Sequence, residues 1–556
     1  MDTGGTSKDK LTETGLGLPS TGGAHAGQGD ASPPQPVPPV QEDVPVSLGS
    51  RQEDQSEDPA NASSDEEILN VRIRPGRRGG GFGGDGAGEA APFELGGRRR
   101  RSQYTTRNLT QGSVPGNLLF LAWPQVVEGV LNVVDQMADL FWAGRGVGAK
   151  AIAGLGVAQS YTQLIMTGRQ GLDIGMQAMV ARAIGAGRVG LANHVVLQAF
   201  TLSSVAVLLT VVVGVFLTDF LMRVLGVSQE VIGVASLYMK IQFIGFGTAA
   251  FRMMSGGALQ AAGDSLTPMK ATMLTRVTHI ILGPLLFFGV GPLPTMGLAG
   301  LALGNVLAQC PAVVWNFSAL FAGTSRLHLT LRGYYTDWPL LARLVRLGAP
   351  AIFTGMERSL VQLLLVRMVT SFGDYALAAY ALTRRAENFS QLGSQGLGRS
   401  AGILVGQNLG AGSESRAKTT MSWALSYVML LNGIIGFFLL AFPALFVSIF
   451  NQEPELLATA VIWVRLQAIA SIVMGGNMVF QQSFSVAGDT VAPMVVTLVS
   501  MVFVELPLAF ALAYWTPLGQ YGIPTAVAVA MGLRTLLYLI YYFMGQARWL
   551  RVKVLD

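Results

Sequence analysis

From residue 117 to residue 545, long apolar stretches alternate with short polar breaks. Each stretch exceeds the roughly 20 residues that a helix needs to cross a bilayer. We therefore predict an all-α membrane protein with twelve transmembrane helices. The predicted ranges are 117–143, 153–181, 193–218, 232–257, 268–290, 297–321, 345–371, 376–404, 418–447, 458–482, 493–515 and 522–545.

The second six predicted helices repeat the first six. The Gly-Ala-Gly of residues 185–187 recurs at 410–412, and the Ala-Gly-Asp of 262–264 recurs at 487–489, both 225 positions later. Several matches in one register indicate a duplicated unit, so we predict two pseudo-symmetric six-helix lobes. Because six is even, the copies are parallel repeats, a layout found in secondary transporters. Further matches at this spacing are Pro268 with Pro493, Gly297 with Gly522, and Ala151 with Ala376.

Basic residues between the predicted helices gather on one side. Cytoplasmic loops of membrane proteins carry an excess of Lys and Arg. We therefore expect both termini to be cytoplasmic, in a multi-pass protein of the plasma membrane. The residues on the predicted inner side are Arg182, Arg188, Lys270, Arg326, Arg332, Arg343, Arg346, Arg416, Lys418, Arg548, Arg551 and Lys553.

The first fifth of the chain has a different composition. Charged residues make up 13% of the whole chain, about half the usual share of a soluble protein, yet positions 1–107 hold 28 of them. We predict that residues 1–110 form a disordered acidic and then Arg/Gly-rich cytoplasmic tail. Arg/Gly-rich segments can bind RNA, but we favour a flexible linker and expect no nucleic-acid partner. The remaining boundaries are a first lobe at 111–325, a loop at 326–342 and a second lobe at 343–556.

Several kinds of chemistry are excluded. Cys310 is the single cysteine, so neither an intramolecular disulfide nor a cysteine-rich metal site can form. The sequence contains no phosphate-binding loop, no His-Glu-x-x-His motif and no Ser/His/Asp set. We therefore predict no enzyme activity and no cofactor, apart from a coupling ion, H⁺ or Na⁺.

Four segments resemble signatures of the multidrug and toxic compound extrusion (MATE) transporters. They are Val-Ala-Arg-Ala-Ile-Gly-Ala-Gly at 180–187, Val-Gly-Gln-Asn-Leu-Gly-Ala-Gly at 405–412, residues 258–264 and residues 139–145. The resemblance covers residues 115–545 and leaves the tail outside. It implies a V-shaped pair of six-helix lobes that exports organic, often cationic, compounds in exchange for a cation. The expected partners are a small cationic or amphiphilic organic substrate and the lipid bilayer, and we expect a monomer.

The first predicted helix carries a polar stripe. Glu128, Asn132, Asp135 and Asp139 lie on one face at about 100° per residue. Ionisable groups inside a membrane are costly and therefore mark candidate functional sites, where carboxylates hold a proton or a cation. A structural network between helices is the alternative. The family resemblance implies that Asp139 binds the coupling cation.

The fifth predicted helix departs from the family pattern. Many members have Asn-x-x-Asn and then Asp, whereas this chain has Arg276, His279 and Gly283, and Asn305 on the sixth helix stands where Thr is common. A sodium site here would have one carboxylate ligand fewer than in those members. A histidine instead offers a nitrogen that titrates near neutral pH and can hold a proton. We favour proton coupling through Asp139 with His279 nearby. A packing role for the histidine stays open.

In the second lobe, two glutamates are candidates for substrate binding. Arg385-Ala386-Glu387 resembles an Arg-x-Glu signature of the family, and Glu357 lies near an acidic position that some members use. Together with Glu128, these carboxylates would attract a cationic substrate. Arg169 and Asp173, one turn apart on the second helix, are predicted to form an ion pair within that helix.

The sequence thus favours a secondary active exporter that antiports organic cations or amphiphiles against H⁺, with Na⁺ as the other coupling ion. A lipid-linked saccharide flippase of the same architecture is an alternative, and a basic cavity would favour it. A third alternative is a membrane scaffold that acts through its N-terminal tail.

Overall fold

The computed structural model describes residues 107–146, 149–224, 229–289, 295–450 and 453–555. All of them belong to one compact unit, Leu95–Asp556. The tail predicted for residues 1–110 lies almost entirely outside the described residues. Every element assigned in the described part is helical.

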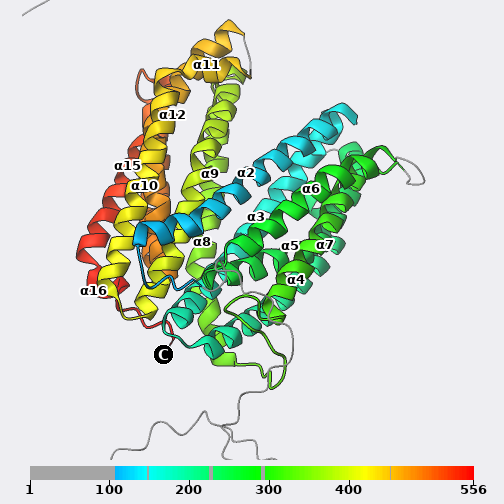
Figure 1. Cartoon of the computed structure of the whole chain (residues 1–556). Helices are drawn as coiled ribbons and strands as arrows, with labels where there is room; N and C mark the ends of the chain where they lie inside the picture. The colour runs from blue at the N-terminus through cyan, green and yellow to red at the C-terminus, as the bar shows by residue number, and fades with distance from the viewer. Residues whose placement is uncertain (1–106, 147–148, 225–228, 290–294, 451–452, 556) are drawn as a thin grey trace, which may run out of the picture. The chain divides into compact units, whose positions relative to one another are not determined.

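Six long helices form the first half of the described chain. α5 packs on α4 and α7, and α6 packs on α7 and α2. In Figure 1, α4, α5 and α7 lie together. The helices are α2 (Val114–Gly146), α3 (Ala149–Gly185), α4 (Val189–Val224), α5 (Gln229–Ala261), α6 (Leu266–Phe288) and α7 (Leu298–Phe321).

Six more long helices form the second half, which confirms twelve in the part of the chain that the structure describes. α12 packs on α9, α10 and α15 (Figure 1). One of the six changes its pitch midway, from α13 (Val491–Leu498) through the π-helical η1 (Val499–Glu505) to α14 (Leu506–Tyr514). The others are α8 (Trp338–Thr370), α9 (Asp374–Gly410), α10 (Glu414–Ala441), α12 (Pro454–Ala487) and α15 (Gly522–Met544), and the short elements are α11 (Pro443–Ser448), η2 (Gly519–Tyr521) and α16 (Gln546–Trp549).

The helix α8 begins at Trp338, seven residues before the start that hydropathy predicts. The side chain of Asp337 accepts a hydrogen bond from the backbone N–H of Leu340 at 3.0 Å. Pro339 occupies the first turn, where its missing N–H costs nothing. An N-cap and a proline thus start the helix in polar sequence, ahead of its apolar part.

Seven helical segments of the described chain are long and apolar enough to cross a membrane by composition: those of α2, α4, α6, α10, α12, α13–α14 and α15. Outside this set, α3, α8 and α9 carry arginines and acidic residues along their length. These charged helices pack against one another, because α3 contacts both α8 and α9. The helices that carry the charged residues therefore include those through which the two halves of the chain meet.

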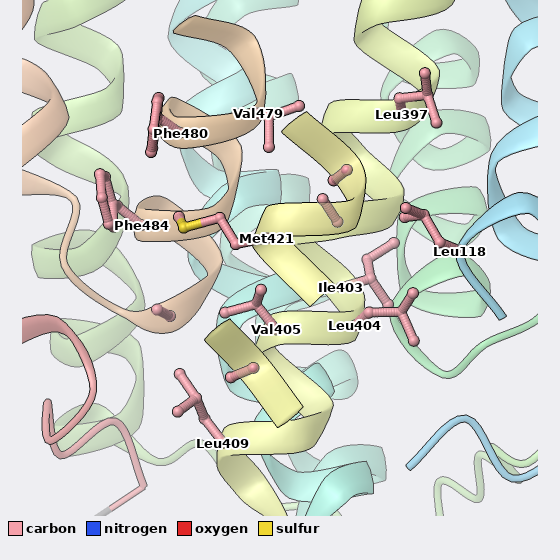
Figure 2. Close-up of a cluster of buried hydrophobic side chains, with 14 of the residues drawn as sticks. Leu118, Leu397, Ile403, Leu404, Val405, Leu409, Met421, Val479, Phe480 and Phe484 are labelled. Carbon is pink, nitrogen blue, oxygen red and sulfur yellow. The ribbon is translucent and has the colours of Figure 1, made fainter. Parts of the chain in front are cut away.

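Buried apolar side chains join helices from both halves. Figure 2 shows Leu118 of α2 beside Leu404 of α9, with Met421 of α10 and Phe484 of α12 in the same cluster. In contrast, large apolar side chains such as Phe216 of α4 are exposed on the outer helix faces. In a membrane such faces contact lipid, so close packing, not the hydrophobic effect, holds the helices together.

The sequence repeat reappears in the local geometry of the loops. Gly187 and Gly412, 225 residues apart, both have φ of 73°, a left-handed conformation that glycine adopts without strain. Asp264 accepts a hydrogen bond from the backbone N–H of Thr267 at 3.1 Å, and Asp489 accepts one from Ala492 at 3.3 Å. The duplicated sequence therefore builds duplicated turns.

Candidate functional site

A buried charged cluster, which we call the α2–α6 cluster, consists of Asn132, Asp135, Arg276 and His279. Arg276 Nη1 lies 2.5 Å from Asp135 Oδ2, and His279 Nδ1 lies 2.8 Å from Asp135 Oδ1. Arg276 also donates to Asn132 Oδ1, from Nε at 3.0 Å and from Nη2 at 2.7 Å. One carboxylate is thus shared by a guanidinium and an imidazole.

Helix periodicity explains why these four side chains meet. Asn132 and Asp135 are three residues apart on α2, and Arg276 and His279 are three residues apart on α6, so each pair shares one helix face. Asp135 and His279 are at most 3% exposed. Because a charge without a partner is costly at such depth, a change of protonation at Asp135 or His279 must alter how α2 and α6 hold together.

Asn305 and Asp139, the other two residues predicted for cation coupling, are not part of this cluster as the structure describes it. Asn305 of α7 accepts a hydrogen bond from Gln309 at 2.7 Å, and Gln309 in turn accepts one from Arg252 at 3.5 Å. Asp139 lies on α2, four residues after Asp135, but its side chain is outside the described residues.

Glu128, which we predicted to bind substrate, lies nearer the other end of α2. Its carboxylate accepts hydrogen bonds from Gln260 Nε2 at 3.4 and 3.5 Å. The positive charges that act on it come from Arg399 of α9 and Arg252 of α5. The described part of the polar stripe of α2, from Glu128 to Asp135, therefore faces arginines.

Arg169 and Asp173 form the ion pair predicted within α3. Two parallel hydrogen bonds join them, Nη1 to Oδ1 at 2.9 Å and Nη2 to Oδ2 at 2.6 Å. Both side chains are buried. Bidentate pairing of this kind satisfies both charges inside the protein, which confirms the prediction.

The second half contains a cavity of about 70 Å³, which we call the second-half cavity. Of the two glutamates predicted for this half, Glu387 lines it and Glu357 is not among the lining residues. Glu387 forms an ion pair with Arg384 and accepts a hydrogen bond from Gln391 at 2.8 Å. Thus the one predicted carboxylate that reaches this cavity already has partners.

A second ion pair in this cavity was not predicted. Glu505 closes the π-helical turn η1, and its Oε2 lies 3.7 Å from Arg534 Nη2 of α15. Arg358 of α8 also lines the cavity. The signal was present in the sequence, because each of these residues is ionisable and lies within a predicted transmembrane helix. Arg276 of the α2–α6 cluster could be recognised in the same way.

The ends of α3 and α9 meet at a contact between the two halves, which we call the helix-end crossing. Arg182 Nη2 donates to the backbone carbonyl of Ala487 at 2.6 Å. Gln407, 225 residues after Arg182, donates from Nε2 to the carbonyl of Ala261 at 2.7 Å. Each half thus donates one side-chain hydrogen bond to the backbone of the other.

Two glycines allow this close approach. A Cβ on Gly185 would collide with the carbonyl oxygen of Gln407, and a Cβ on Gly410 would collide with that of Arg182. The Gly-Ala-Gly segments found in the sequence therefore lie where the two helix ends touch backbone to backbone.

Comparisons with known proteins identify the family and the fold. The family profile described as MatE matches residues 124–285 and 350–511, one match in each half. The probable multidrug resistance protein YoeA of Bacillus subtilis (strain 168) is 24% identical over 440 residues, which cover 79% of this chain and 95% of YoeA. The FAD transporter of Shewanella oneidensis is 22% identical over 396 residues, which cover 70% of this chain and 86% of that protein.

Solved structures share the same fold. A multidrug resistance MATE family transporter of the MOP superfamily, in an outward-facing conformation, aligns with a TM-score of 0.75 at 18% sequence identity. The alignment covers 80% of this chain and 98% of that one. The prediction of twelve transmembrane helices in two six-helix lobes is confirmed.

Proposed function

Because the chain belongs to the MatE family of multidrug efflux transporters, we propose that it is a secondary active exporter in which inward proton flow drives small organic compounds out. The observation that carries the proton assignment is the buried Asp135 carboxylate, shared by Arg276 and His279. We propose that the protein works as a monomer in the plasma membrane, with both termini cytoplasmic.

The α2–α6 cluster supports H⁺ over Na⁺. Hard cations such as sodium prefer several oxygen ligands, but both carboxylate oxygens of Asp135 already contact nitrogen atoms. The fixed positive charge of Arg276 would repel a further metal cation. A proton needs only one basic atom, and the Asp135 carboxylate or the His279 imidazole supplies it.

Protonation offers a way to change conformation. Neutralising Asp135 leaves Arg276 without its carboxylate, and breaking a buried pair costs about 3–5 kcal/mol. A two-state equilibrium shifts from 1:99 to 99:1 with about 5.5 kcal/mol, so one buried pair supplies most of that difference. α2 contacts α9 as well as α6, and a movement of α2 therefore reaches both halves. Asp139, one helical turn further along α2, extends this proton path in our proposal.

We propose that the helix-end crossing is the closed gate of the transporter. The positive-inside distribution of basic residues supports a cytoplasmic position for it. With the crossing intact, the interior would open only to the outside, and release of the crossing would open it to the cytoplasm. Alternating access in secondary transporters works by such rocking of two bundles.

A lipid-linked saccharide flippase is the second candidate. Three arginines, Arg358, Arg384 and Arg534, line the second-half cavity, and a basic cavity suits an anionic lipid headgroup. The FAD transporter among the relatives also carries an anionic compound. Either substrate would be handled by the same alternating movement, so the driving ion is the first question to test.

Transport in proteoliposomes, with a pH gradient or a sodium gradient imposed separately, tests the proposal. We expect a pH gradient alone to drive transport of at least one dye from a panel of organic cations and anions. Deletion of residues 1–105 is expected to leave transport intact, which a scaffold acting through its tail would not. Transport driven by sodium alone, or by neither gradient, would overturn the proton assignment.

A further inference from the structure

The second-half cavity contains an arginine without a carboxylate partner. Arg384 pairs with Glu387 and Arg534 pairs with Glu505. Among the residues that the structure describes, no carboxylate oxygen lies within 4.0 Å of Arg358, whose Nη2 donates to Gln481 Oε1 at 3.3 Å. The charged groups that act on Arg358 from a greater distance include the arginines Arg384 and Arg534 and the carboxylates Glu357, Glu387 and Glu505. The lining therefore holds three guanidinium groups and two carboxylates.

Several buried N–H groups of the lining also lack an acceptor. Within the described chain, Trp463 Nε1, Gln467 Nε2 and Arg534 Nη2 have no hydrogen-bond acceptor, and all three side chains are at least nine-tenths buried. Among the described residues of the lining, Glu505 Oε2 is the one buried acceptor without a hydrogen-bond donor, and it lies 3.7 Å from Arg534 Nη2. A buried donor without a partner costs about 1–3 kcal/mol. The cavity thus presents a surplus of donors to whatever enters it.

The rest of the lining combines neutral polar side chains with apolar, adaptable ones. Tyr380 and Trp463 meet edge to face with ring centroids 6.1 Å apart. Methionine side chains fill irregular gaps and contact aromatic rings favourably, so they can adapt to the apolar part of a bound molecule. The methionines of the lining are Met474, Met478, Met501 and Met531.

We propose that the second-half cavity binds an amphiphilic organic anion. Its phosphate or carboxylate accepts hydrogen bonds from Arg358 and from the unpaired donors of Gln467 and Trp463, and its apolar body packs on the methionines and Tyr380. The inference rests on the proposed exporter function and names the substrate class of that transporter. A cationic substrate would instead be repelled by Arg358 and would leave the unpaired donors unsatisfied.

Calorimetric binding to the purified full chain in phosphatidylcholine nanodiscs tests the inference without any ion gradient. The probes share one ring system and differ in charge: 1-naphthyl phosphate, 1-naphthol and 1-naphthylmethylammonium. We expect 1-naphthyl phosphate to bind tightest and Arg358→Gln to weaken it by about tenfold or more, since charge-assisted hydrogen bonds are the strong ones. Arg358→Lys is expected to recover part of the loss.

The matched control is Arg346→Gln, which removes the same charge from an exposed position of the same helix. It is expected to leave the affinity for 1-naphthyl phosphate unchanged within about twofold. Thermal unfolding of each variant separates a lost site from a lost fold. Tighter binding of 1-naphthylmethylammonium, or an unchanged phosphate affinity in a folded Arg358→Gln variant, would overturn the inference.

Adding phosphatidylglycerol to the nanodiscs distinguishes the source of the anion. Competition between this lipid and 1-naphthyl phosphate, abolished in Arg358→Gln, assigns the site to a lipid headgroup. Absence of competition assigns it to a soluble anion. Because the measurement needs no gradient, a protein that binds the phosphate but is not driven by protons would refute the coupling proposal alone.

Discussion

The sequence repeat is preserved at the helix-end crossing but not among the charged residues of the interior. At the crossing, Arg182 and Gln407 occupy equivalent repeat positions and make equivalent hydrogen bonds to the opposite half. In the interior, the positions 225 residues after Arg276 and His279 are Met501 and Val504. One region keeps the two-fold relation and the other has lost it.

The same divergence runs in the other direction. Arg534, which pairs with Glu505 in the second-half cavity, corresponds to the neutral Gln309 of the first half. The gate that we propose at the crossing requires two surfaces that fit each other, and two similar helix ends, each with glycine at the contact, meet this requirement. Coupling an ion to a substrate requires two different sites, so the charged residues of the two interiors must differ.

The largest effect should come from the side that has lost symmetry. Asp135→Asn leaves Arg276 buried without a carboxylate, and we expect proton-driven transport in proteoliposomes to fall by at least about 100-fold, because breaking a buried pair costs about 3–5 kcal/mol. Asp135→Asn combined with Arg276→Gln removes both charges and should restore thermal stability but not transport. The control is Asp219→Asn, because the Asp219 side chain is 49% exposed and pairs with Lys240. Normal proton coupling in Asp135→Asn would remove the α2–α6 cluster from the mechanism.

The glycines of the crossing test its symmetry directly. Gly185→Ala and Gly410→Ala each drive a methyl group into a backbone carbonyl of the other half. Overpacking of this kind costs about 1–3 kcal/mol, and we expect equal losses of thermal stability and of transport in the two variants. Gly190→Ala, at a glycine with open space around it, is the control. Losses that differ by more than about 1 kcal/mol would show that the crossing is not two-fold in energy.

His279 lies in the interior of the first half and has no ionisable counterpart in the second half, where the equivalent residue is Val504. His279→Gln keeps a polar side chain beside Asp135 but cannot become charged, so transport driven by a pH gradient should fall by about tenfold and its pH profile should change. His328→Gln, at an exposed loop position, should leave the pH profile as it is. An unchanged profile in His279→Gln would assign the histidine to packing alone.

The smallest effect should come from making the crossing more symmetric. Arg182→Gln gives the first half the residue that the second half has at Gln407, and an amide N–H can still donate to the carbonyl of Ala487. We expect a loss of at most about 1 kcal/mol in thermal unfolding, and a larger loss for Arg182→Ala. Equal losses in both variants would mean that the guanidinium, not merely a donor, is required.

The sequence predicts the fold well because helix length and repeat spacing are local signals. The apolar stretches predict all twelve long helices, whereas the start of α8 depends on Asp337 and Pro339 in polar sequence. The stripe on the first helix predicts that Asn132 and Asp135 share a face, and they do share one.

The partners of Asn132 and Asp135 could not be predicted from the sequence. Which helix faces the stripe depends on packing across 140 residues of chain, so the role of Arg276 could not be assigned from spacing. Glu505 was accessible in principle as an acid inside a helix. Its pairing with Arg534 could not be predicted, because Glu505 ends the π-helical turn η1 and the hydrophobic periodicity of the sequence does not predict a π-helical turn. The role of Asp139 stays a prediction.

The crossing has the geometry of a two-fold dimer interface. In such an interface the same patch is used by both subunits, and residue i of one contacts residue j of the other in both directions. A separate six-helix unit with a donor at the end of its second helix and a free carbonyl at the end of its fourth would make this contact with a second copy of itself. Joining two such units into one chain preserves the interface and frees each interior to acquire its own charges.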